Sequence, residues 1–124
     1  MLGSPLIGVI EDDEDVRLSL EDLLHSLGYR TKSFASADAF VHDEECRPDC
    51  VLSDVQMPGM SGIELTRHIR RTQPDLPVVL ITAFPSKDIA RQATDAGASS
   101  FLRKPFDPAD LLACLERALR RPDD

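Results

Sequence analysis

The sequence has few cysteines, no long apolar stretch and a deficit of positive charge. Its three cysteines are an odd number without CxxC spacing, which argues against a disulfide framework or a zinc site. A strongly apolar run such as residues 77–81 is far below the roughly 20 residues of a membrane span. The start, Met1–Pro5, lacks the charged and apolar regions of a signal peptide. We expect a soluble cytoplasmic protein with reduced thiols and no membrane partner.

Several motifs of known chemistry are also missing. There is no GxxxxGK[ST] or GxGxxG loop, so nucleotide binding has no support, and no GxSxG sequence suggests a hydrolase. The 22 acidic residues outnumber the 14 basic ones, giving a formal charge of −8. Nucleic-acid binding requires a basic face, so we expect no direct contact with DNA or RNA. Clustered carboxylates would suit a divalent cation better.

The composition is that of one globular domain. The 124 residues are 42% hydrophobic and 29% charged, and they show no internal repeat or low-complexity stretch. We therefore expect a single domain over residues 1–124.

Short apolar runs alternate with helical patterns along the chain. Strands are predicted at residues 6–10, 30–34, 49–53, 77–82 and 99–102. A helix follows each strand; the first carries the apolar stripe from Val16 to Leu27, and the others start at caps Ser36, Ser61, Ser86 and Asp107. Ser61 and Glu64 have capping-box spacing. Strict alternation predicts an α/β fold, with a doubly wound parallel sheet of five strands and helices on both faces.

Polar side chains follow the predicted strands. Glu11, Asp12 and Asp13 follow the first strand, Asp54 follows the third, Thr82 ends the fourth, and Lys104 closely follows the fifth. The carboxyl ends of parallel strands share one edge of the sheet, so we expect these side chains to converge.

Their chemistry is selective. Carboxylates a few Å apart repel one another unless a proton or a cation intervenes, and oxygen ligands favour Mg²⁺ or Ca²⁺. Lys104 could hold a phosphate oxygen, and the Thr82 hydroxyl could donate to another. Asp54 is the natural acceptor, because carboxylates form aspartyl-phosphate intermediates. The set therefore indicates phosphoryl transfer.

Four segments carry a resemblance to a known family. They are VIEDD (9–13), LSDVQMPGMSG (52–62), LITA (80–83) and RKPF (103–106). In order and spacing they resemble the receiver domain of bacterial two-component response regulators, across essentially the whole chain. The resemblance implies a flavodoxin-like receiver fold with strand order 2-1-3-4-5. The segments KPF (104–106) and MSGIEL (60–65) resemble those of receiver domains in transcriptional regulators.

The resemblance also implies a set of site residues. Asp54 would accept phosphate from a sensor histidine kinase or phosphotransfer protein, and Mg²⁺ would be the cofactor. The implied metal ligands are Glu11, Asp12, Asp54 and the backbone carbonyl of Gln56, and the implied phosphate contacts are Thr82 and Lys104. The Lys104–Pro105 peptide bond would be cis, an option that proline makes accessible.

Signalling would run through a switch. The resemblance implies that Thr82 and Phe101 move on phosphorylation and change the face formed by the fourth helix, fifth strand and fifth helix. That face would control an output domain or effector protein, and it is the candidate homodimer surface. Two residues depart from the common pattern. Glu11 stands where many members have Asp, and Phe101 stands in place of Tyr, so it lacks a hydroxyl.

Three alternatives stay open at this point. The acidic run after the first strand could be only a solvated helix N-terminus. An EF-hand loop starting at Asp12 is excluded, because the sixth residue of such a loop must be glycine and is Arg17 here. The domain could be a metal-dependent phosphohydrolase, or an adaptor that is never phosphorylated. We expect a phosphoacceptor module and not an enzyme, with at most slow self-phosphorylation and autodephosphorylation.

Overall fold

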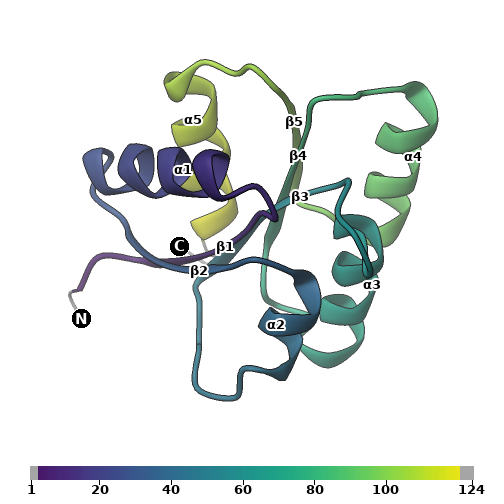
Figure 1. The fold of residues 1–124 in the computed structure, drawn as a ribbon, viewed down its shortest axis with the longest axis horizontal. Coiled ribbons are helices and arrows are strands. Elements are labelled where there is room, and N and C mark those ends of the chain that lie inside the picture. The colour runs from purple at the N-terminus through teal and green to yellow at the C-terminus, as the bar shows by residue number, and fades with distance from the viewer. Residues whose placement is uncertain (1–2, 121–124) are drawn as a thin grey trace.

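The chain forms alternating strands and helices, as Figure 1 shows. The computed structural model describes residues 3–120; residues 1–2 and 121–124 of the predicted 1–124 domain lie outside the described residues. The elements are β1 (Leu6–Ile10), α1 (Glu14–Ser26), β2 (Arg30–Phe34), α2 (Ala37–His42), β3 (Cys50–Asp54), α3 (Gly62–Thr72), β4 (Val78–Thr82), α4 (Lys87–Ala96), β5 (Ser100–Arg103) and α5 (Pro108–Leu119).

The five strands form one parallel sheet in the order β2-β1-β3-β4-β5, which confirms the predicted α/β architecture. Helices α1 and α5 cover one face of the sheet, and α2, α3 and α4 cover the other (Figure 1). Each face has its own apolar core. The order of the strands changes direction beside β1 and β3, and ligand sites in such sheets lie at that crevice.

The inner strands β1, β3 and β4 read as largely apolar runs because both faces of the sheet are covered there. Every residue of β3 and β4 is buried. All three cysteines are free, as the sequence predicted. Cys114 is buried beside Leu111 and Leu115 in the core under α1 and α5. Burial raises the pKa of the Cys50 thiol to about 12, so this thiol stays protonated and inert.

Strand β3 begins and ends one residue later than the predicted 49–53. Asp54 is the last residue of β3 and pairs with Ile81 of β4, so its backbone is fixed by the sheet and not by a loop. The predicted boundary was wrong because the ends of a strand depend on its hydrogen bonds to the neighbouring strand. The apolar run of β3 alone does not reveal where that pairing stops.

The predicted helix caps explain where the helices start. The Ser36 hydroxyl accepts from the Ala39 N–H, and the Ser86 hydroxyl accepts from the Ile89 N–H. Ser61 and Glu64 form the complete capping box at the start of α3. Asp107 occupies the predicted N-cap position of α5, but its side chain makes no capping hydrogen bond.

Arg70 fastens α3 to α4. Its guanidinium donates to the carbonyl of Gly97 at 3.1 Å, to that of Pro74 at 2.5 Å and to that of Leu76. Gly97 ends α4 in the left-handed conformation, with φ of 99°. The fully buried side of α4 offers only the small residues Ala93 and Ala96, so the bond from Arg70 to Gly97 supplements a small buried apolar contact.

We predict that Arg70→Met lowers the free energy of unfolding by about 2–3 kcal/mol, because three carbonyls lose a cationic donor. Urea unfolding followed by circular dichroism measures the change. Arg71→Met is the matched control, since Arg71 is exposed and should change stability by less than about 0.5 kcal/mol. Equal stability of the two variants would contradict the role given to Arg70.

Candidate functional site

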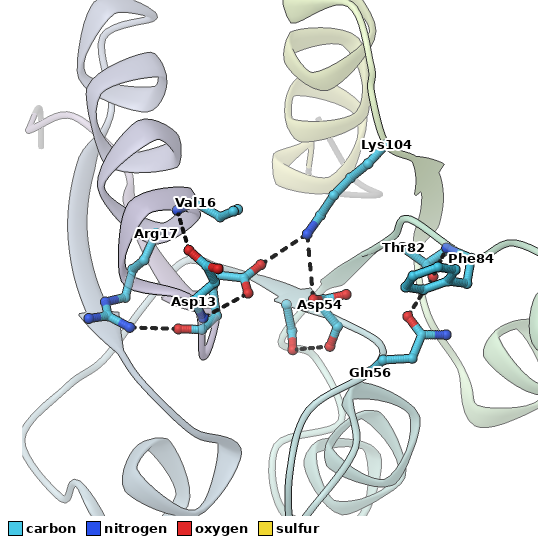
Figure 2. A network of polar contacts seen from close by, with 10 residues as sticks. Asp13, Val16, Arg17, Asp54, Gln56, Thr82, Phe84 and Lys104 are labelled. Atoms are coloured by element: carbon cyan, nitrogen blue, oxygen red, sulfur yellow. Dashed lines mark hydrogen bonds and ion pairs between the residues drawn. The ribbon is translucent and has the colours of Figure 1, made fainter.

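The carboxyl ends of four strands bring the predicted site residues to one edge of the sheet. Asp54 ends β3, Thr82 ends β4, Glu11 follows β1, and Lys104 follows β5. The register of β3 and β4 places Asp54 and Thr82 close to the same edge, since Asp54 pairs with Ile81 and Thr82 is the next residue of β4. Figure 2 shows the side chains of Asp54 and Lys104 facing each other across this edge.

Three carboxylates form the centre of the site. Glu11, Asp12 and Asp54 each offer an oxygen, and these atoms lie within 4.8 Å of one another. Glu11 is 1% exposed and Asp54 is 8% exposed, whereas Asp12 lies at the surface. Glu11 and Asp54 are therefore nearly shielded from water, and Asp12 adds a third carboxylate from the surface.

Glu11 is held by its own loop and by α1. The Arg17 guanidinium donates to the Glu11 backbone carbonyl at 2.8 Å, and the Asp13 N–H donates to Glu11 Oε2 at 3.1 Å. Burial raises the pKa of Glu11 above its usual range, and the charge of Asp54 adds to this; the Asp13 N–H and Lys104 oppose it. A nearby divalent cation would favour the ionised form of this carboxyl.

Lys104 supplies the cation of the site. Its Nζ donates to Glu11 Oε1 at 3.1 Å and lies 3.5 Å from Asp54 Oδ2. The Lys104 backbone N–H donates to the Thr82 carbonyl at 2.7 Å, and the Lys104–Pro105 bond is cis. One lysine therefore bridges the acids of β1 and β3 from the end of β5.

Asp54 keeps one oxygen without a partner. Its Oδ1 is buried, and no group among residues 3–120 donates a hydrogen bond to it. An ionised oxygen left unpaired away from water is costly, so such a group needs an explanation. Oxygen ligands and an unsatisfied anionic oxygen are what a hard divalent cation requires, so the residues present fit a metal of the Mg²⁺ or Ca²⁺ type.

The Thr82 hydroxyl is occupied by a different partner. Thr82 is fully buried; its Oγ1 donates to Gln56 Oε1 at 2.6 Å and accepts from the Phe84 N–H at 3.0 Å. The sequence implied a role only for the Gln56 backbone carbonyl, so the bond from its side chain to Thr82 was missed. A side-chain bond between residues 26 positions apart leaves no signature in sequence spacing.

Phe101 lies away from this cluster. It is half-buried on β5, opposite Leu80, and packs against the core beneath α2, α3 and α4. The roles of Asp13 and Arg17 in orienting Glu11 were also missed. The available signal was their position beside Glu11, with Asp13 at the N-cap of α1 and Arg17 in its first turn.

An acidic pocket with a bridging lysine thus lies at the switch point of a five-stranded doubly wound parallel sheet. A sequence model of the response regulator receiver domain matches residues 7–116, and the chain belongs to this family. The fold class and the family predicted from the sequence are therefore confirmed.

Curated relatives include regulators of transcription. The transcriptional regulatory protein FixJ of Bradyrhizobium diazoefficiens is 38% identical over 94% of this chain and 58% of its own length. The response regulator protein TmoT of Ectopseudomonas mendocina is 35% identical, over 93% of this chain and 53% of its own. NtrC of Escherichia coli, a DNA-binding transcriptional regulator, is 36% identical over 92% of this chain and 24% of its own length. The chain thus spans between 24% and 58% of the length of these relatives.

Solved structures agree with this placement. Chemotaxis protein CheY4 of Vibrio cholerae superposes with a TM-score of 0.86 at 28% identity, covering 94% of this chain and all of its own. Response regulator DrrB of Thermotoga maritima superposes with a TM-score of 0.83 at 34% sequence identity, covering 94% of this chain and 52% of DrrB. Among the described residues, no helix is both long and apolar enough to cross a bilayer.

Proposed function

We propose that this domain is a phosphoryl-accepting switch of a two-component phosphorelay. Asp54 receives the phosphoryl group from a histidine kinase or a phosphotransfer protein. The single observation that supports this most is the convergence of Glu11, Asp12 and Lys104 on Asp54, which has a buried oxygen without a partner.

The transfer is a displacement at phosphorus. A carboxylate oxygen of Asp54 forms the new O–P bond while the N–P bond of the phosphohistidine breaks, and its electron pair returns to the imidazole. Glu11, Asp12, Asp54 and the backbone carbonyl of Gln56 would hold Mg²⁺, which supplies positive charge against the transferring oxygens. Lys104 neutralises further charge and stays as the contact of the phosphorylated state.

Switching follows from competition for Thr82. To donate to the phosphoryl group, the Thr82 hydroxyl must leave Gln56 Oε1, which it contacts at 2.6 Å. Phe101 then repacks, and the face formed by α4, β5 and α5 changes toward the state that an output domain, an effector or a second copy binds. Phosphate acts only as far as it favours one state over the other.

The domain acts as a module and not as a turnover enzyme. The greater length of the relatives, and their names as regulators, support the view that such a receiver controls a transcriptional output domain. A cytoplasmic location is part of the proposal. Self-phosphorylation and autodephosphorylation by the isolated domain would be slow.

The proposal predicts that incubation with acetyl phosphate and Mg²⁺ adds one phosphate to the domain, detected by intact-mass spectrometry. Asp54→Asn and chelation of the metal with EDTA should each prevent the addition, because one removes the acceptor and the other the counter-charge. Phosphate on the Asp54→Asn variant would refute the assignment. Sustained release of many phosphates per protein would instead indicate a phosphohydrolase.

A further inference from the structure

A groove of about 410 Å³ lies on the outer side of α3. Its lining residues come from α3 and the loop before it: Gly59, Met60, Glu64, Arg67, His68 and Arg71. We call this surface the α3 groove. None of these residues belongs to the acidic site, and α3 covers the face of the sheet opposite α1 and α5 (Figure 1).

Two arginines in the α3 groove have no acidic partner. Within residues 3–120, the cations in ion pairs are Lys32, Arg91 and Lys104, and neither Arg67 nor Arg71 is among them. Both arginines are exposed, and their spacing of four residues puts them on one side of the helix.

Neighbouring charges offset the pair only in part. Glu64 lines the same groove and contributes one negative charge, but its carboxylate accepts from the Ser61 N–H in the capping box and forms no ion pair with either arginine among residues 3–120. Arg70 lies between the two arginines in sequence and donates to a different set of partners, the carbonyls of Gly97 at the end of α4 and of Pro74 and Leu76 before β4. Arg67 and Arg71 therefore stand together without an ion pair, and with Glu64 they leave the groove a net positive charge in a chain of net charge −8.

The floor of the α3 groove adds an apolar element. Met60 is half-buried, packs against the core and lines the groove beside the arginines. A thioether is polarizable and adapts to apolar groups of different shapes. The groove thus combines two free guanidinium groups, which can bind carboxylates in a fork, with one soft apolar contact.

We propose that the α3 groove docks an acidic, partly apolar peptide segment of a partner protein. Carboxylates of the segment bind Arg67 and Arg71, and an apolar side chain rests on Met60. This surface is separate from phosphoryl acceptance and does not depend on it. The net negative charge of the domain disfavours nucleic acid as the occupant, because a long polyanion would be repelled beyond the groove.

A second copy of the chain fits less well. The acidic first turn of α1, with Glu14 and Asp15, lies on the opposite side of the sheet from α3. Pairing α1 of one copy with α3 of another would be head-to-tail, and such contacts close only as rings or continue as open filaments. A segment from a different protein meets the groove without this constraint.

The test uses a fluorescein-labelled synthetic hexapeptide, Glu-Glu-Leu-Glu-Glu-Leu, which is short enough not to extend far beyond the groove. Binding is followed by fluorescence anisotropy at low salt. We expect saturable binding to the wild-type domain that weakens as salt is added. Arg67→Glu/Arg71→Glu should weaken binding by about tenfold or more, because two attractions become repulsions. Arg47→Glu/Lys87→Glu makes the same charge change at exposed cations elsewhere and should bind as the wild type does.

Location and chemistry are checked separately. The Met60 methyl signal and the amides of α3 should shift in NMR spectra on titration, and Asp54→Asn should bind the peptide unchanged. Circular dichroism confirms that each variant is folded. The proposal is overturned if the wild type does not bind, if the two double variants bind alike, or if a Gln-Gln-Leu-Gln-Gln-Leu peptide binds equally well. The proposal is also overturned if a single-stranded oligonucleotide displaces the labelled peptide at a lower concentration than the unlabelled peptide does. Self-association of the domain that Arg67→Glu/Arg71→Glu abolishes would overturn it as well.

Discussion

Replacing Lys104 with methionine should slow the phosphorylation of Asp54 by about 100-fold, the usual cost of removing one preorganised donor from a transferring oxyanion. The ammonium group lies 3.1 Å from Glu11 Oε1 and 3.5 Å from Asp54 Oδ2, so it is placed to neutralise charge at the acceptor. Methionine has a similar length and no charge. The rate is measured by intact mass at timed intervals with acetyl phosphate and Mg²⁺.

Lys87→Met is the matched control for this prediction. Lys87 is exposed at the start of α4, and its loss removes the same charge away from the site. The control should be phosphorylated at the wild-type rate. If Lys104→Met stays within about threefold of the wild type, Lys104 contributes no electrostatic stabilisation of the kind described.

Replacing Gly62 with alanine should lower the free energy of unfolding by about 3 kcal/mol, the upper end of the usual cost of overpacking. A Cβ on Gly62 would lie 2.2 Å from the Asp54 carbonyl oxygen and 3.1 Å from Leu80 Cδ2. The clash is with backbone, which cannot rotate away as a flexible side chain can. The start of α3 or the end of β3 must therefore move, so phosphorylation of Asp54 should also fall.

Gly8→Ala separates this clash from the general effect of losing a glycine. Gly8 is buried in β1, and its Cβ would meet Phe40 and Pro48 at 3.5 Å, an ordinary contact. We expect a change below about 1 kcal/mol for this variant. Urea unfolding compares the two. Similar stabilities would show that the close approach of α3 to Asp54 is not a constraint.

Much of the acidic site could be predicted from local patterns. The apolar runs predicted the strands to within one residue at their ends, and the residues beside those ends include Glu11, Asp54 and Lys104. The serine caps at positions 36, 61 and 86 were likewise predicted, because a cap bonds to an amide three residues away. These inferences work since each depends on contacts within one element or on one rule of parallel sheets.

Other features could not be predicted in this way. The bond from Thr82 to the Gln56 side chain and the three carbonyls held by Arg70 join segments that only packing brings together. The Asp107 side chain was expected to cap α5 and makes no such bond, since a favoured residue at a cap position does not fix its rotamer.

The motifs of the sequence carried the resemblance to receiver domains. By itself, the sequence determined a parallel α/β domain with carboxylates and a lysine at the carboxyl edge of its sheet. The reason is that strand period, helix caps and the right-handed crossover leave few ways to arrange such a chain. Only the tertiary structure decided that Asp54 Oδ1 lacks a partner, that Gln56 occupies the Thr82 hydroxyl, and that Arg67 and Arg71 flank a groove. These depend on side-chain directions across elements distant in sequence, which are set when the helices pack on the sheet.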